Sequence, residues 1–190
     1  MQHLVYLHGF LSSPKSEKAQ QTLAFAKTHF PWLNVHLPEL PGDIDVSISK
    51  IDSLVSTLPT GRFSFIGSSM GGFLSTYCVE KYGGKAVLIN PAVEPFNLLS
   101  AYIGQHVNPY TDEKFVIHSG HLSKLKGAST EYLKSPKAYF TLLQKGDETL
   151  DYRLAAKKYA KAKLVIEDGG NHSFVDYHKH LPDIFKFLLS

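Results

Sequence analysis

Residues 63–79 read Phe-Ser-Phe-Ile-Gly-Ser-Ser-Met-Gly-Gly-Phe-Leu-Ser-Thr-Tyr-Cys-Val, and this stretch carries the most informative motif of the chain. An apolar run at 63–66 and a helical run from Phe73 flank a Gly-x-Ser-x-Gly motif at 67–71, which is typical of a nucleophile elbow. Glycine is needed on both sides of the serine because side chains there would clash in so tight a turn. The turn holds the Ser69 hydroxyl near a helix N-terminus, where free N–H groups and the helix dipole stabilise negative charge.

The rest of the chain offers the two partners that an activated serine needs. A serine hydroxyl is a weak nucleophile at neutral pH, so a base must take its proton and a further group must orient that base. In α/β folds with a nucleophile elbow, the acid and then the histidine follow the serine along the chain. Asp147 follows the apolar run at 139–144, and His172 follows the one at 164–167. We therefore predict a triad of Ser69, Asp147 and His172.

Each member of this triad has an expected role. His172 takes the proton of Ser69 during attack and returns it to the leaving group, while Asp147 fixes the imidazole tautomer and stabilises the imidazolium. The alternative for Asp147 is a turn or capping aspartate beside glycine. Asp151 is the main rival for the acid, and Asp168 is a weaker one because it shares the short loop of His172.

Two backbone N–H groups are expected to form an oxyanion hole. One belongs to Met70, the residue after the nucleophile, and the other to the loop His-Gly-Phe-Leu at 8–11, where Phe10 is the predicted donor. His8 is expected to be structural. Leu11 and Tyr102, together with the side chains of the two donors, are predicted to line an apolar acyl pocket.

The order of apolar runs and helical patterns predicts an α/β architecture. We expect residues 1–190 to form one domain with a mainly parallel sheet flanked by helices, in a compact α/β-hydrolase fold. The predicted strands cover residues 2–7, 34–37, 63–66, 85–90, 139–144 and 164–167. Two helices are predicted after N-caps, one after Ser13 with Pro14 at its first position and one after Asp43. Three more are predicted at residues 69–82, at 151–160 and, near the C-terminus, around 181–188.

The stretch at about 91–136 breaks this rhythm, because it contains several proline and glycine residues and short helical pieces. An insertion after a central strand of an α/β enzyme is often a lid above the carboxyl ends of the strands. We predict a small helical lid here, and the alternative is a helical excursion that covers a sheet edge.

Composition limits the classes of function. The chain has 190 residues, 43% of them hydrophobic, and a net charge of +3, which is too small to argue for a nucleic-acid partner. Cys78 is the only cysteine, so we expect no internal disulfide and a buried thiol. We see no secretory signal and no apolar run long enough to span a bilayer, and expect a cytoplasmic protein.

Several closely spaced histidines are considered as candidate metal ligands. His118 with His121, or His178 with His180, are closely spaced, but no His-Glu-x-x-His pattern or acid cluster accompanies them in the sequence. We therefore expect these histidines to face solvent and predict no metal and no organic cofactor.

Five motifs that span nearly the whole chain are informative as a set. They are Tyr6-Leu7-His8-Gly9-Phe10 with Ser12-Ser13-Pro14, Gly67-Ser68-Ser69-Met70-Gly71-Gly72, Asn90-Pro91-Ala92, Gly146-Asp147-Glu148 with Leu150-Asp151-Tyr152, and Gly169-Gly170-Asn171-His172-Ser173-Phe174. The set resembles the YqiA-type esterases, which are small bacterial α/β-hydrolases. This resemblance implies hydrolysis of small acyl esters, or of acyl thioesters, without a cofactor, and places its triad on Ser69, Asp147 and His172. Leu11 departs from the pattern, since many relatives have a polar residue there, often asparagine.

Two further functions fit the same residues. A thioesterase or acyltransferase, including one acting on acyl-CoA, would use the same triad and pass the acyl group to another acceptor. A binding protein on a hydrolase scaffold would need no chemistry, although such proteins usually lack a triad member. The sequence does not predict the oligomeric state.

Overall fold

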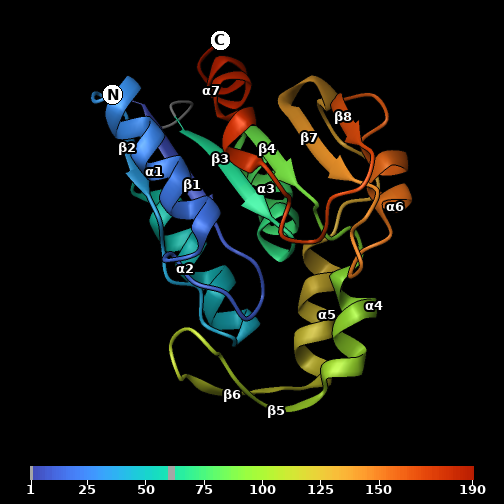
Figure 1. The fold of residues 1–190 in the computed structure, drawn as a ribbon. Helices are drawn as coiled ribbons and strands as arrows, with labels where there is room; N and C mark the ends of the chain where they lie inside the picture. The colour runs from blue at the N-terminus through green and yellow to red at the C-terminus, as the bar shows by residue number, and fades with distance from the viewer. Residues whose placement is uncertain (1, 60–62) are drawn as a thin grey trace.

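Six parallel strands form the central sheet of the computed structural model, which describes residues 2–59 and 63–190 (Figure 1). The strands lie in the order β2-β1-β3-β4-β7-β8, and every neighbouring pair is parallel. Their bounds are β1 (His3–Leu7), β2 (Asn34–His36), β3 (Phe63–Ser68), β4 (Lys85–Ile89), β7 (Tyr139–Gln144) and β8 (Lys163–Glu167). The predicted mainly parallel sheet is confirmed.

Helices cover both faces of this sheet. On one face lie α1 (Glu17–His29) and α7 (Leu181–Leu189). On the other face lie α2 (Ile44–Ser56), α3 (Met70–Tyr82) and α6 (Tyr152–Lys158). Three-residue or four-residue 3-10 turns occur at Ser100–Tyr102, Pro136–Ala138 and Tyr177–His180.

Consecutive residues of the central strands enter opposite layers of the core. In β1, Val5 and Leu7 pack against the layer that contains α3, whereas Leu4 and Tyr6 pack against the layer that contains α1 and α7. A parallel sheet that is covered on both faces needs apolar residues at every position, which explains the unbroken apolar runs in the sequence.

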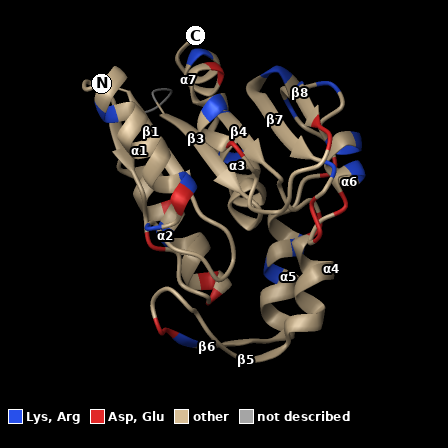
Figure 2. Ribbon diagram, in the orientation of Figure 1, with Lys and Arg blue, Asp and Glu red and all other residues tan. Residues whose placement is uncertain are grey.

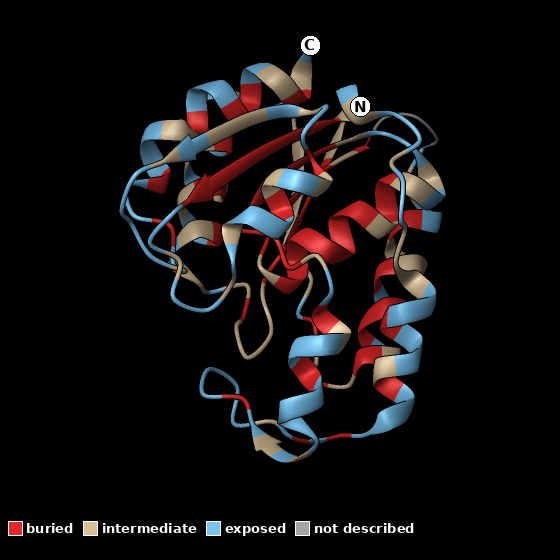
Figure 3. Ribbon diagram, turned by 90° about the vertical axis from the view of Figure 1, so that its right-hand side faces the viewer, coloured by how far each residue is buried: buried red, intermediate tan, exposed pale blue. Residues whose placement is uncertain are grey.

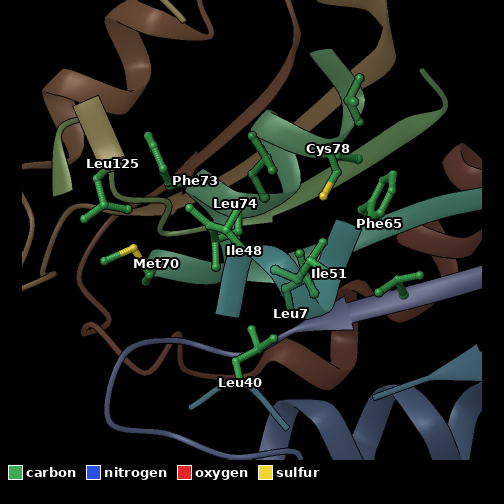
Figure 4. Packing of buried hydrophobic residues seen from close by; sticks show 14 of the residues in the cluster. Leu7, Leu40, Ile48, Ile51, Phe65, Met70, Phe73, Leu74, Cys78 and Leu125 are labelled. Atoms are coloured by element: carbon green, nitrogen blue, oxygen red, sulfur yellow. The ribbon is translucent and has the colours of Figure 1, made fainter. Parts of the chain in front are cut away.

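One layer of the core surrounds α3, which is buried on nearly all sides (Figure 3). In the close view of this core, Met70, Phe73, Leu74 and Cys78 project from α3 toward neighbouring apolar side chains (Figure 4). Cys78 is fully buried, as predicted, and its burial raises the pKa of the thiol far above the usual range. This thiol is therefore inert at neutral pH.

The two predicted helix caps have different outcomes. Asp43 caps α2, since its Oδ1 accepts a hydrogen bond of 3.0 Å from the N–H of Val46. The predicted Ser13 cap is wrong, because α1 begins only at Glu17. Ser13 instead closes a turn: its hydroxyl accepts from the N–H of Lys15 and its carbonyl from that of Ser16. Pro14 belongs to that turn and not to the helix.

The insertion (residues 91–136) lies beyond the carboxyl ends of the strands, at the bottom of Figure 1. It contains α4 (Pro95–Leu99), β5 (Gly104–Val107), β6 (Lys114–Ile117) and α5 (Ser119–Ala128). The sequence prediction described this segment as helical and missed the antiparallel pair β5–β6. Hydrogen bonds of 3.0 Å tie the insertion to the body, from Asn108 to the carbonyl of Ser12 and from the N–H of Gly42 to Glu113.

Charged residues of both signs are spread over the helices and loops in Figure 2, in keeping with a net charge of only +3. Within the described residues, none of the helices has the length and apolar character required to cross a bilayer.

Candidate active site

Ser69 occupies a strained turn between β3 and α3. Its backbone has φ 56° and ψ −118°, a left-handed conformation that residues other than glycine rarely adopt. A Cβ added to Gly67 would overlap the carbonyl of Gly71, and one added to Gly71 would overlap the carbonyl of Leu7. The two glycines of the motif are thus required by close backbone contacts. The helix begins at Met70, one residue later than expected.

The structure brings Ser69, Asp147 and His172 together from three loops at the carboxyl ends of the strands. The Nε2 atom of His172 lies 3.1 Å from the Oγ atom of Ser69. Its Nδ1 atom lies 2.9 Å from both carboxylate oxygens of Asp147, whose side chain is 2% exposed. The N–H groups of Thr149 and Leu150 also donate to Asp147, so the carboxylate is held from two directions.

The rival acids are bound elsewhere. Asp151 caps α6 by accepting a hydrogen bond from the N–H of Arg153. The guanidinium of Arg153 also donates to the carboxylate of Asp151 at 2.8 Å and lowers the pKa of that carboxyl. Asp168 is exposed and pairs with Lys145 at 2.6 Å. Of the three candidates, Asp147 is the one in contact with the imidazole.

Asn90 positions the histidine loop, and the sequence prediction gave it no role. The residue follows β4 with φ 39° and is 2% exposed. Its Nδ2 atom donates to the carbonyls of Asn171 and His172 at 3.0 and 3.3 Å. Its Oδ1 atom accepts from the N–H of Gln144 at 3.0 Å. Asn90 therefore links the ends of β4 and β7 to the loop that carries the imidazole.

Gln144 and Glu148 hold the same loop from the other side. The Oε1 atom of Gln144 accepts from the N–H groups of Asn171 and Val175 at 3.2 and 2.9 Å. Glu148 accepts from the N–H of His172 at 3.0 Å, and this hydrogen bond lowers the pKa of its carboxyl. A signal for Gln144 exists in the sequence, since it is an amide at the end of a mainly apolar strand.

The loop after β1 lies directly against Ser69. A Cβ added to Gly9 would come within 3.4 Å of the Cβ atom of Ser69. Met70 is the first residue of α3, where backbone N–H groups have no partner inside the helix. In the described loops and caps, no backbone carbonyl accepts from the N–H of Phe10 or Met70. Both groups are therefore candidate donors.

His8 shapes this loop through backbone contacts. Its Nδ1 atom donates to the carbonyl of Gly9 at 2.9 Å, and its Nε2 atom accepts from the N–H of Leu40 at 3.0 Å. The carboxylate of Glu39 lies 3.6 Å from Nε2, but that nitrogen already uses its lone pair on Leu40. Burial therefore dominates and lowers the pKa of His8, which stays neutral.

A small cavity of about 20 Å³ lies beside the loop of residues 8–11. Its lining is mainly apolar and consists of His8, Gly9, Phe10, Leu11, Leu40, Pro41, Gly42, Ile44, Ser47, Met70, Leu74 and Asn108. Tyr102 lies further out, 44% exposed, with its ring edge-on to that of Phe10 at 6.0 Å. A larger cavity of about 290 Å³ lies at the amino ends of β1, β3 and β4, at the opposite end of the sheet from Ser69.

The other histidines differ from the prediction in one case. His118 and His178 are exposed, and His180 forms an ion pair of 3.0 Å with Glu167. His121 is only 1% exposed, so the expectation that it faces solvent is wrong. It is buried because α5 packs against α2, a tertiary contact that the local sequence pattern does not reveal.

The sheet order, the strained elbow and the flanking helices define the fold of the α/β-hydrolases. The model of the uncharacterised protein family UPF0227 matches residues 3–189. The chain belongs to this family, which is the YqiA-type family that its motifs resemble.

Solved structures with the same fold come from distant organisms. Alpha/beta hydrolase domain-containing protein 10 from mouse has a TM-score of 0.71 at 14% identity, over 99% of this chain and 90% of that one. Est1E from Butyrivibrio proteoclasticus has a TM-score of 0.69 at 14% identity, over 99% and 87%. An esterase from Pyrococcus furiosus has a TM-score of 0.65 at 15% identity, over 100% and 82%. At these identities the likeness establishes the fold.

Proposed function

We propose that this protein is a serine esterase that hydrolyses small acyl esters through an acyl-enzyme intermediate. The observation that carries the proposal is the continuous contact from Asp147 through His172 to Ser69, at 2.9 and 3.1 Å. Each atom in that relay has the partner that nucleophilic catalysis by serine requires.

In the acylation step, the Oγ atom of Ser69 attacks the ester carbonyl while the Nε2 atom of His172 takes its proton. The imidazolium then gives that proton to the leaving alcohol, whose bond to the acyl carbon breaks. Asp147 accepts from the Nδ1–H of the imidazole and stabilises its positive charge. The product is an ester between the acyl group and Ser69.

In the deacylation step, a water molecule replaces the alcohol. His172 takes a proton from this water as its oxygen attacks the acyl carbon, and returns the proton to Oγ of Ser69 as the carboxylic acid leaves. Both steps pass through an oxyanion, which the N–H groups of Phe10 and Met70 would bind. Removal of one such donor typically costs about 3–4 kcal/mol of transition-state stabilisation.

The size of the cavity beside the oxyanion loop favours short acyl groups. A volume of about 20 Å³ holds little more than one water molecule. The side chains of Leu11, Leu40 and Leu74 bound it and would contact the end of the acyl chain. We therefore propose esters of short acyl groups as substrates, with Leu11 as a contact residue.

Chromogenic esters with acyl chains of graded length provide the test, each paired with the matching thioester. Wild-type protein is expected to hydrolyse the two-carbon and three-carbon esters best, and Ser69→Ala should lose this activity while remaining folded. Equal rates for both proteins would refute the esterase proposal. Faster cleavage of thioesters than of oxygen esters would replace it with a thioesterase that uses the same residues.

A further inference from the structure

A buried histidine outside the active site faces two carboxylates where α5 packs on α2. His121 lies in the first turn of α5, and among the described residues neither of its ring nitrogens has a hydrogen-bond partner. Its Nε2 atom lies 3.5 Å from Oδ1 of Asp43 and 3.9 Å from Oδ2 of Asp45. An unpaired polar group that is 1% exposed is costly, so its retention requires an explanation.

The distances are too long for hydrogen bonds and suit a shared metal ion. An N–H···O hydrogen bond spans about 2.7–3.2 Å. Zinc lies about 2.0–2.2 Å from imidazole nitrogen and carboxylate oxygen with tetrahedral angles, which separates neighbouring ligand atoms by roughly 3.4 Å. Ligand atoms of the three residues all lie within 4.8 Å of one another. We propose that Asp43, Asp45 and His121 bind a divalent transition-metal ion of the zinc type.

The other contacts of the two carboxylates are compatible with this site. The oxygen of Asp43 that faces the imidazole, Oδ1, also accepts from the N–H of Val46 at 3.0 Å, and a carboxylate oxygen has a second lone pair for an ion. The ammonium of Lys124 lies 3.6 Å from Oδ1 of Asp45, so Oδ2 is the oxygen directed at the imidazole. Both carboxylates are partly exposed, which gives the ion a path from solvent and room for a water molecule as fourth ligand.

The site would join the insertion to the body of the protein. Asp43 and Asp45 begin α2, which packs on the sheet, whereas His121 belongs to the insertion. A bound ion would therefore stabilise the docking of α5 on α2. None of its ligands belongs to the proposed triad, so the inference does not depend on the esterase proposal.

Zinc titration of metal-free protein by calorimetry, together with thermal unfolding, tests the site. The wild type should gain roughly 5–10 °C in Tm when free zinc exceeds its Kd about 100-fold. Asp45→Asn should weaken zinc binding at least about 10-fold, because the exposed side chain keeps its size but loses its charge. Asp43→Asn should do the same, and asparagine preserves the helix cap. Lys124→Ala should tighten binding by removing a competing cation.

Surface histidines also bind zinc, so His178→Ala is the matched control and should retain the affinity and the Tm shift of the wild type. Cobalt in place of zinc should give the visible absorption of a tetrahedral site, which Asp45→Asn should lose. The proposal is overturned if Asp45→Asn and wild type bind zinc with equal affinity, or if zinc leaves the Tm of the wild type unchanged.

Discussion

The loops that carry Ser69, Asp147 and His172 and the insertion beside them are held in different ways. The loops are fixed by buried polar side chains, since Asn90 and Gln144 are 2% and 3% exposed and bond directly to the histidine loop. The insertion instead presents apolar side chains to solvent, among them Ile103, Val107 and Val116, each at least half exposed. It is anchored to the body by apolar packing, since Ile117 and Leu125 are fully buried in the core that contains α2 and α3, and by two hydrogen bonds.

The two regions are therefore suited to control different properties of the reaction. A hydrogen-bonded, buried frame can keep reacting atoms within a fraction of an ångström, as catalysis demands. A segment that is held by apolar packing and leaves other apolar side chains exposed can adapt to the part of the substrate that does not react. We therefore expect changes in the loops to lower kcat, and changes in the insertion to alter KM.

The largest effect should come from the acid. Asp147→Asn leaves the shape of the loop intact but favours the wrong imidazole tautomer, and kcat for a short ester should fall by about 10⁴-fold. Asp151→Asn provides the matched control, because its carboxylate contacts Arg153, and it should retain nearly full kcat. Steady-state kinetics of both variants decide the point. A larger loss in the Asp151 variant would reassign the acid.

A smaller loss is expected from the residue that positions the histidine loop. Asn90→Ala removes two hydrogen bonds to that loop and one to Gln144, so the imidazole can shift relative to Ser69. We expect kcat to fall by about 10²-fold with little change in KM. Circular dichroism should show a folded variant. A change in KM alone would mean that Asn90 contributes to binding and not to position.

A substitution in the insertion should change KM and leave kcat nearly unaltered. Tyr102→Ala removes an exposed ring that packs on Phe10, and KM should rise by a few-fold while kcat stays within about twofold. Esters with bulky alcohol groups should reveal the largest change. A loss of kcat comparable with that of Asn90→Ala would show instead that the insertion helps to position the reacting groups.

The smallest expected effect is a change in the free energy of unfolding with pH. Burial lowers the pKa of His8 below its usual value near 6.5, so the unfolded chain binds this proton more readily than the folded protein does. Stability is therefore complete above pH 6.5 and decreases as the pH falls below it, by at most about 1.4 kcal/mol per pH unit. Urea unfolding at several pH values should show this slope, and His8→Gln should reduce it. An unchanged slope would mean that folding does not lower the pKa of His8.

Much of the fold could be predicted because its signals are local. The elbow, the glycines around Ser69 and the apolar runs each depend on a few neighbouring residues, and parallel topology brings the carboxyl ends of strands together. The positions of Asp147 and His172 follow from that rule. Their catalytic roles remain predictions.

The parts that could not be predicted depend on contacts between distant segments. Strands β5 and β6 have four residues each, too few for alternation to distinguish them from a loop. The burial of His121 depends on the packing of α5 against α2. An asparagine such as Asn90 after a strand has many possible roles, and its bonds to a loop 81 residues away appear only in three dimensions.

Labelling with a fluorophosphonate probe tests directly whether Ser69 is an activated nucleophile, because such probes react with a serine that a histidine has activated. Wild-type protein should incorporate one probe molecule, which peptide mass spectrometry should locate on Ser69, and Ser69→Ala should remain unlabelled while folded. His172→Ala should react far more slowly. If folded wild-type protein stays unlabelled, or labels equally well in the Ser69→Ala variant, Ser69 is not an activated nucleophile and the account is wrong.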